Sequence, residues 1–359
     1  MTHILTVSDV YYPRCSGVSI YVQELCEELA NRGFDISVYT PTSLRDYYDT
    51  VKGITVNRFH ETEIYRAYSI SLPLLKSLMK QKPDIIHGHH YGYFPATAGF
   101  LAAKKTNVPF VFSTHFHPPV YNPIRTGFFY LYHFTQGLPL LRFSDAVLPH
   151  TSIEKTNLCK MGAVAEKIKV LPSITDVEIF RNKLSGKSKN PIVLFVGPLI
   201  YEKGAHIFID LQHKLPKNVQ YVFVGEGYLE NEIRKKIKNS KIFNKLPLEK
   251  LIEIYNKADI FVLPSMYEAF GRVLTEAQAC EVPVVSTRAG GIPEVVIHNK
   301  TGYLVNYGEW ELMAEYIKKL LDDSGLRRRI GYEGRKHVVK SFSKKVVVDK
   351  LVKIYERLL

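Results

Sequence analysis

The sequence predicts an α/β protein built from two Rossmann-like parallel-sheet domains that face each other across a cleft. Short apolar runs alternate with helical patterns along most of the chain, and this alternation is typical of a parallel sheet covered by helices. The alternation restarts after a polar stretch at residues 181–190. The length of 359 residues suits two cores of roughly 150 to 200 residues each.

The first domain is expected at residues 1–180. Apolar runs predict its strands at residues 4–7, 36–40, 85–87, 110–113 and 146–149. Between the first two runs, residues 18–31 have the apolar spacing of a helix. This alternation of strands and helix predicts one parallel sheet in the first domain.

Residues 181–190 are interpreted as the linker, and residues 191–342 as the second domain. Its strands are predicted at residues 192–196, 220–224, 260–263 and 284–286. The last segment, residues 343–359, repeats apolar side chains at helical spacing. We expect it to form a helix that packs back across the domain junction.

Composition excludes several classes of protein. Hydrophobic residues make up 46% and charged residues 23% of the chain, a balance that excludes a disordered or fibrous protein. The four cysteines are scattered and are expected to be reduced thiols. The N-terminus lacks the basic start and apolar stretch of a signal peptide, and no run of about 18 apolar residues predicts a membrane span. These features predict a cytoplasmic protein.

The net charge of +13 favours anionic partners. Nucleotide diphosphates, nucleic acid and an acidic membrane leaflet all satisfy it. The basic clusters at residues 235–238 and 327–329 have no aromatic interleaving and are more typical of solvated helix faces. We therefore expect no nucleic-acid partner.

The strongest functional signal is a pair of glutamates after the predicted strand 260–263. Glu268 and Glu276 stand eight residues apart, with Gly271 between them. A helix that begins near Gly271 would direct its N-terminal amides and dipole toward a diphosphate. Carboxylates accept hydrogen bonds from hydroxyls, so they suit the two sugars that flank a diphosphate. In the alternative interpretation, Glu268 caps the helix and Glu276 lies on a solvated face.

This segment resembles the E-x7-E motif of the family 4 retaining glycosyltransferases, which have the two-Rossmann GT-B fold. Further similarity covers nearly the whole chain, at residues 12–17, 33–35, 258–265, 283–286 and 290–294. The resemblance implies transfer of a hexose from a nucleoside diphosphate sugar, UDP- or GDP-linked, to a hydroxyl acceptor with retention of configuration. No cofactor is implied beyond this co-substrate.

The resemblance also implies a role for each matching residue. Glu268 would bind the hydroxyls of the donor sugar in a catalytic position, and Glu276 the ribose. Lys203 would bind the diphosphate, where a cation stabilises the departing nucleotide. The remaining donor-binding positions are Gly17, Gly225, Phe270, Gly271, Arg272 and Val273. For Gly225, which lies in a Gly-x-Gly sequence, a simple tight turn is an equally good interpretation.

One position departs from the family pattern. Pro198 stands where the family usually has an arginine that contacts the diphosphate. Arg272 is the nearest candidate to replace that charge. Because no Asp-x-Asp is placed to hold a metal, and because Lys203 and the helix N-terminus are cationic, we expect metal-independent transfer.

Histidines mark the first domain's strand ends. His115 follows the strand 110–113 and matches the catalytic-site histidine that lies against the donor sugar in the family. We prefer it to His117 on position alone, although a lone histidine is more often structural. His87, His89 and His90 come after the apolar pair at residues 85–86 and suit either the acceptor side or a metal, which no carboxylate or thiol cluster supports.

The stretch 121–142 is rich in aromatic residues and leucine. It is either a core helix or, together with the basic surface, a site of peripheral contact with an acidic membrane at its inner face. The second interpretation favours a lipid-linked or cell-envelope glycan as the acceptor.

Two rival functions remain at the level of sequence. One is another reaction on the same architecture, an epimerase or a phosphorylase. The other is a non-catalytic, basic binding protein in which Pro198 marks a decayed donor site.

Overall fold

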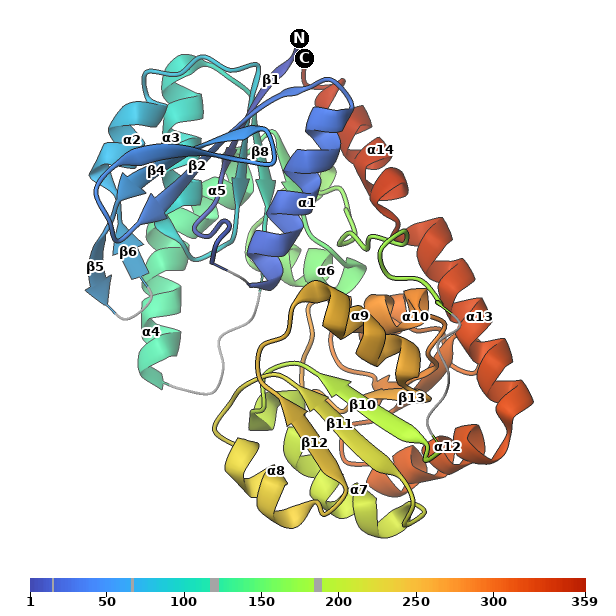
Figure 1. Ribbon diagram of the computed structural model, residues 1–359. Coiled ribbons are helices and arrows are strands. Elements are labelled where there is room, and N and C mark those ends of the chain that lie inside the picture. The colour runs from blue at the N-terminus through green and yellow to red at the C-terminus, as the bar shows by residue number, and fades with distance from the viewer. Residues whose placement is uncertain (15, 66–67, 117–122, 184–188) are drawn as a thin grey trace. The chain divides into compact units, whose positions relative to one another are not determined.

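The structure is a computed structural model that describes residues 1–14, 16–65, 68–116, 123–183 and 189–359. It divides into two compact units (Figure 1). The first comprises Met1–Ile174 and Lys344–Leu359, and the second comprises Thr175–Ser343. Each unit contains its own largely parallel sheet, which confirms the predicted α/β class with two such sheets.

The first unit has a sheet with the strand order β3-β4-β2-β1-β7-β8-β9. Its strands are β1 (His3–Val7), β2 (Asp35–Thr42), β3 (Tyr47–Val51), β4 (Ile54–His60), β7 (Ile85–His89), β8 (Phe110–Ser113) and β9 (Ala146–Leu148). The edge strand β3 is antiparallel to β4, and the other neighbours are parallel. A separate hairpin joins β5 (Thr62–Tyr65) to β6 (Tyr68–Ile70).

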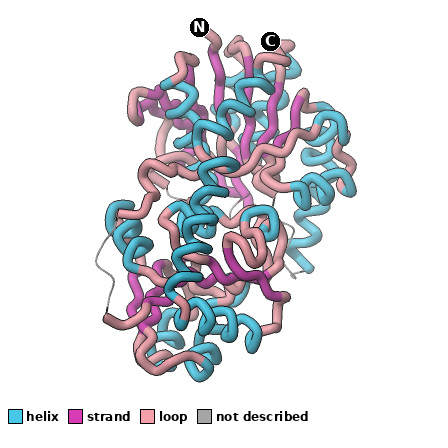
Figure 2. The backbone as a smooth tube through the Cα atoms, turned by 90° about the vertical axis from the view of Figure 1, so that its right-hand side faces the viewer, coloured by secondary structure: helices cyan, strands magenta, loops and turns pink. Residues whose placement is uncertain are grey.

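Helices lie on both faces of this sheet, as Figure 2 shows for the strands and the helices around them. The helices are α1 (Gly17–Asn31), α2 (Leu72–Leu78), α3 (Phe94–Thr106), α4 (Pro123–Tyr132), the π-helix η1 (His133–Gly137), α5 (Leu138–Phe143), α6 (Ser152–Lys160), the 3-10 turn η2 (Ala165–Lys167) and α14 (Lys344–Tyr355). Successive residues of β1 point to opposite faces. Ile4 therefore belongs to the core under α1 and α14, and Leu5 to the core under α2, α3 and α5.

The second unit has a fully parallel sheet with the strand order β12-β11-β10-β13-β14-β15. Its strands are β10 (Ile192–Val196), β11 (Gln220–Val224), β12 (Ser240–Phe243), β13 (Ile260–Leu263), β14 (Val284–Thr287) and β15 (Gly302–Val305). Its helical segments are η3 (Tyr201–Lys203), η4 (Ala205–Ile207), α7 (Phe208–Lys214), α8 (Glu230–Lys236), α9 (Leu248–Lys257), α10 (Arg272–Ala279), α11 (Ile292–Val295), α12 (Trp310–Asp322) and α13 (Ser324–Ser341). One apolar cluster joins both faces of this sheet.

The C-terminal helix α14 returns to the first unit, as predicted. It packs along α1, where Arg32 Nη1 donates to Asp349 Oδ1 at 2.6 Å. Tyr355, which is fully buried, ends the helix against His87. Among the residues described, no helix is both long and apolar enough to cross a membrane.

One strand differs from its prediction in a way that matters for function. β7 extends to His89, so His87 and His89 lie inside the strand and are fully buried. The predicted strand of residues 85–87 already included His87, but the prediction that His89 follows the strand was wrong. The strand accommodates them because each imidazole hydrogen-bonds within the unit.

Candidate functional site

The glutamate pair lies where β13 gives way to α10. Gly271 occupies the N-cap of α10 in a left-handed conformation, with φ 87°. Only glycine adopts this conformation without strain. The N-cap residue, Gly271, makes no side-chain capping hydrogen bond to this helix. The helix begins beside Gly271, as the sequence predicted.

Glu268 is paired with Lys203. The Lys203 Nζ donates to Glu268 Oε1 at 2.7 Å, and Ser265 Oγ donates to the same oxygen at 3.0 Å. The two charged side chains are 23% and 11% exposed. The structure therefore brings together the cation that the resemblance assigns to the diphosphate and the carboxylate that it assigns to the donor sugar.

Backbone contacts fix the loops that carry these two side chains. The Met266 N–H donates to Glu202 O at 2.9 Å, and the Gly291 N–H donates to Glu268 O at 2.8 Å. A Cβ on Gly204 would stand 2.2 Å from Pro264 O, a separation that a real Cβ cannot reach. Glycine at position 204 is thus required for the loops after β10 and β13 to meet.

Glu276 is not on a solvated face, because its side chain is only 12% exposed. The Tyr255 hydroxyl donates to its Oε2 at 3.0 Å, and Arg272 Nε lies 3.9 Å from its Oε1. Burial raises the pKa of the Glu276 carboxyl, while Arg272 and Tyr255 act in the opposite direction. The structure places the charge of Arg272 beside Glu276.

Gly225 stands where two loops of the second unit pass very close. Its φ is 148°, and a Cβ there would lie 2.0 Å from the carbonyl oxygen of Gly197. The neighbouring Leu199 N–H donates to Glu226 O at 2.8 Å. This close backbone approach accounts for the glycine, and a nucleobase contact at Gly225 stays a prediction.

A tyrosine that the sequence reasoning missed lies next to these loops. The Tyr228 hydroxyl accepts the Tyr201 N–H at 3.0 Å, and the two rings are 5.9 Å apart. Tyr228 is 64% exposed. Its signal was an aromatic residue directly after the Gly-x-Gly sequence.

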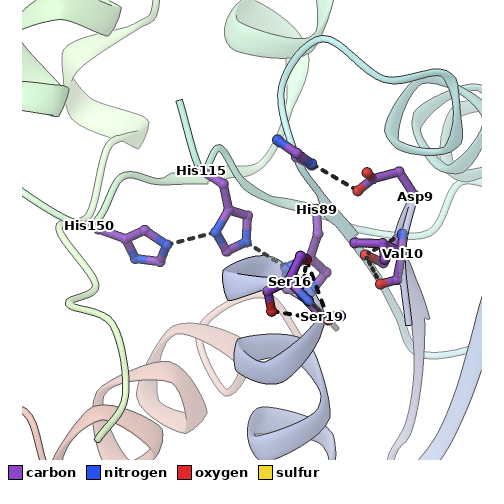
Figure 3. A network of polar contacts seen from close by, with 9 residues as sticks. Asp9, Val10, Ser16, Ser19, His89, His115 and His150 are labelled. Carbon is purple, nitrogen blue, oxygen red and sulfur yellow. Dashed lines mark hydrogen bonds and ion pairs between the residues drawn. The ribbon is translucent and has the colours of Figure 1, made fainter. Parts of the chain in front are cut away.

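In the first unit, three histidines form a hydrogen-bonded chain (Figure 3). His89 Nδ1 lies 3.2 Å from His115 Nε2, and His115 Nδ1 lies 2.8 Å from His150 Nε2. At the far end, His150 Nδ1 lies 2.9 Å from the carbonyl oxygen of Leu171. A carbonyl only accepts, so His150 Nδ1 carries a proton. In the neutral chain the same reasoning assigns the proton of His115 and of His89 to Nδ1.

Burial keeps His87, His89 and His115 uncharged. It lowers the pKa of His89 and of His115 well below the ordinary value, and it lowers the pKa of His87 to about 3. His87 bridges the Tyr355 hydroxyl at 2.6 Å and Ser113 Oγ at 2.9 Å. These are the contacts of histidines held neutral inside a core.

His115 combines this packing with strained backbone. Its φ is 43°, which is uncommon outside glycine and is often found at functional sites. Both of its ring nitrogens are engaged by other histidines. A hydrogen bond from His115 to a sugar would therefore require one of these partners to move. His117 lies outside the described residues.

His150 was missed at the level of sequence, although it follows β9 at the same sheet edge where His89 ends β7 and His115 follows β8.

His90, the other acceptor-side candidate, has its Nδ1 2.9 Å from Asp9 Oδ1. Among the residues that the structure describes, no group of three or more histidine, cysteine or acidic side chains is arranged to hold a metal ion.

Gly17 begins α1, directly after the N-cap Ser16. Ser16 and Ser19 form a capping box in which each side chain accepts the other residue's N–H, at 3.1 and 2.7 Å. A Cβ on Gly17 would meet nothing within 4 Å. Packing within the chain therefore does not require glycine at this position.

The aromatic stretch forms one continuous helical segment from α4 through η1 to α5, and residues 121 and 122 lie outside the described part. Several of its side chains are 48% to 66% exposed: Phe128, Tyr130, Leu131, Phe134 and Phe143. Others, such as Leu140 and Leu141, are fully buried. The segment is thus a core helix on one side and an exposed apolar surface on the other.

Comparison with known proteins covers both units. Residues 15–179 match the family model described as Glycosyltransferase Family 4, and residues 176–337 match the model described as Glycosyl transferases group 1. The chain is 31% identical over 296 residues to the sulfoquinovosyl transferase of Arabidopsis thaliana, with 76% of this chain and 56% of that protein covered. It thus spans little more than half the length of that relative.

Solved structures agree with this over the whole chain. Sucrose-phosphate synthase from Thermosynechococcus elongatus matches with a TM-score of 0.82 at 21% identity, covering 100% of this chain and 99% of that one. HepE of Anabaena, solved in complex with UDP, matches with a TM-score of 0.80 at 20% identity, covering 99% and 100%. These likenesses confirm the GT-B fold.

Proposed function

Since the chain belongs to the family 4 glycosyltransferases, whose second domain is the group 1 domain, we propose that it transfers a hexose from a nucleoside diphosphate sugar to a hydroxyl acceptor with retention of configuration. The donor is UDP- or GDP-linked, and the UDP complex of HepE favours UDP. The observation that carries the proposal is the pairing of Lys203 with Glu268 beside the N-terminus of α10.

The site supports this chemistry through three groups with different tasks. Glu268 accepts hydrogen bonds from the sugar hydroxyls, and Glu276 accepts them from the ribose. The N-terminus of α10, at Gly271, Arg272 and Val273 and next to Phe270, together with Lys203, offsets the charge of the diphosphate. Gly225 and Gly17 would approach the nucleobase and the phosphates through backbone alone.

In the transfer step, the acceptor oxygen forms a bond to the anomeric carbon on the face that the diphosphate leaves. The bond from that carbon to the diphosphate oxygen breaks, and its electron pair stays with the diphosphate. The acceptor's proton passes to the released diphosphate. Lys203 stabilises the charge that develops on this leaving group, and we expect transfer without added metal.

The exposed aromatic residues of the α4–η1–α5 segment and the net charge of +13 support peripheral contact with an acidic membrane at its inner face. An acceptor carried by a lipid or by a growing envelope glycan fits such a position.

A thermal-shift screen against UDP, GDP, ADP and their hexose conjugates, without added metal, tests the donor assignment. One nucleotide should stabilise the protein, by about 2.7 kcal/mol when its concentration is one hundred times the Kd. Glu276→Ala should weaken this stabilisation. Glu315→Gln, which alters an exposed carboxylate on α12, should not.

Product analysis separates transfer from the rival reactions. UDP-glucose should release UDP faster when acceptor is present, and the product should be the α-glycoside if the donor is an α-linked sugar. An isomerised nucleotide sugar would indicate an epimerase, and a sugar phosphate a phosphorylase. Absence of any nucleotide shift would instead favour the non-catalytic binding protein.

A further inference from the structure

The first unit contains two neighbouring cavities of opposite character. One has a volume of about 600 Å³ and is lined mainly by apolar and aromatic side chains, among them Ile64, Phe128, Phe129, Leu131 and Tyr132. The other has a volume of about 510 Å³ and is lined by polar and charged side chains, among them Asp9, Arg14, Glu61, Glu63 and His90. Both volumes are typical of small-molecule sites, and Tyr93 lines both cavities.

The polar cavity suits a ligand rich in hydroxyls. Among the described residues that line it, the carboxylates of Asp9, Glu61 and Glu63 outnumber the guanidinium of Arg14. Arg14 Nη1 already donates to Glu61 Oε1 at 3.3 Å, and Asp9 is held by His90. Carboxylates accept hydrogen bonds from hydroxyls and repel phosphate. The chemistry therefore favours a sugar or polyol over an anionic headgroup.

The apolar cavity has a wall that offers few polar contacts. Gln136, which also lines it, already accepts a hydrogen bond from the Thr97 hydroxyl and donates one to the Tyr68 hydroxyl. Phe128 and Leu131 remain 48% and 61% exposed, and exposed apolar surface of this kind is typical of a binding site. A hydrocarbon chain bound in this cavity would cover the exposed apolar surface.

The helical segment that lines the apolar cavity also departs from regular α-helix. The π-helix His133–Gly137 follows directly on α4, the helix that carries Phe128 and Leu131, and such π segments occur frequently at functional sites. Tyr91 holds it in place, because its hydroxyl lies 2.7 Å from His133 Nδ1 and a Cβ on Gly137 would collide with that hydroxyl at 2.0 Å.

We propose that the acceptor is amphipathic, with a hydroxylated, uncharged headgroup in the polar cavity and a hydrocarbon chain in the apolar cavity. Tyr93 lies at the junction, with its ring 4.2 Å from that of His90. The reacting hydroxyl belongs to the headgroup. This inference rests on the proposed function, since it names the class of acceptor for the same transfer reaction.

A series of alkyl β-D-glucosides tests the proposal. Binding of the methyl, butyl, hexyl and octyl glucosides to the full chain is measured by calorimetry with UDP present, below their critical micelle concentrations. The affinity should rise by about fourfold per added methylene, the equivalent of roughly 0.8 kcal/mol. Octyl tetraethylene glycol ether, which has the same chain and no sugar, should bind at least about tenfold more weakly than octyl glucoside.

Matched variants locate the chain. Phe128→Ala should flatten the dependence on chain length and leave methyl glucoside unaffected. Phe134→Ala is the control, because Phe134 is 66% exposed on the same helical segment and does not line the cavity. Leu131→Ser provides a second lining variant at an exposed site. Glu61→Gln should weaken all glucosides by a similar factor, roughly tenfold.

The outcomes separate this inference from the function on which it rests. A flat alkyl series, or a slope that Phe128→Ala and Leu131→Ser leave unchanged, overturns the amphipathic acceptor while stabilisation by UDP leaves the donor site standing. Equal binding of the ether and the glucoside overturns the hydroxylated headgroup. If no nucleotide stabilises the protein, the proposed function itself fails.

Discussion

The buried histidines of the first unit should make that unit sensitive to mild acid. His87, His89 and His115 are held neutral, because burial lowers their pKa values below the ordinary value of 6.5. In the unfolded chain these rings regain that ordinary value. Below pH 6.5 the unfolded state therefore binds more protons than the folded state, and stability must fall as the pH falls. The loss continues until the folded-state values are reached, at about 3 for His87.

The magnitude follows from proton linkage. Lowering the pH from 7 to 5 charges each unfolded imidazole, while a buried ring with a pKa well below 5 stays neutral. His87, whose folded-state pKa is about 3, then costs about 2 kcal/mol, and His89 and His115 add to this loss in the same direction. Since small proteins are stable by only about 5 to 15 kcal/mol, this loss is a substantial part of the stability of the first unit.

Urea unfolding at pH 7, 6 and 5 measures this effect. Circular dichroism follows both units, while fluorescence of the single tryptophan, Trp310, reports the second. His89→Asn keeps an amide donor for His115 and removes one titrating ring, so it should recover part of the loss. His213→Asn, at an exposed position of α7, should recover nothing. An unfolding midpoint that stays constant from pH 7 to pH 5 would refute the reasoning.

Three substitutions probe the second unit. Gly225→Ala should destabilise it by roughly 3 kcal/mol in urea unfolding, because a Cβ there would stand 2.0 Å from a backbone oxygen. Gly17→Ala is the control: a Cβ at position 17 would have no atom within 4 Å, so stability should change by less than about 0.5 kcal/mol. Tyr255→Phe removes a hydrogen bond to the Glu276 carboxylate, so the pKa of this carboxyl should rise further. The acid limb of the pH profile of kcat/KM should then move to higher pH. An unchanged acid limb would contradict a role for ionised Glu276. Pro198→Arg should tighten UDP binding by roughly tenfold in calorimetry without loss of stability, and weaker binding would argue against a diphosphate at this loop.

The arrangement of the proposed donor-binding residues could be predicted from the sequence because its signals are local. A strand, a loop with Glu268, a left-handed Gly271 and a helix with Glu276 follow one another within seventeen residues, 260–276. Each step has its own chemical signature. The pairing of Lys203 with Glu268 needed one further condition, the adjacency of β10 and β13 in the sheet.

The histidine chain was not readable in the same way, because it depends on strand order. His89, His115 and His150 are brought together by the sequence β7-β8-β9 in the sheet. The end of β7 was also misjudged, since polar residues normally end a buried apolar run. There, hydrogen bonds between side chains replace the apolar pattern. The edge strand β3 was missed for a related reason, because most of its residues are exposed and show no apolar alternation.

Pro198 can be judged from the backbone on either side of it. The Gly197 N–H donates to Val224 O at 2.9 Å, and the Leu199 N–H donates to Glu226 O at 2.8 Å. Position 198 lies between these two bonds and is exposed, so the loop does not need the N–H that proline lacks. The proline therefore fits the fold without cost, and its effect falls on the charge available to a ligand. With Arg272 beside Glu276, the proposed binding of the diphosphate would depend on Lys203 and the N-terminus of α10, and Lys203 would have to leave or share Glu268 to take part.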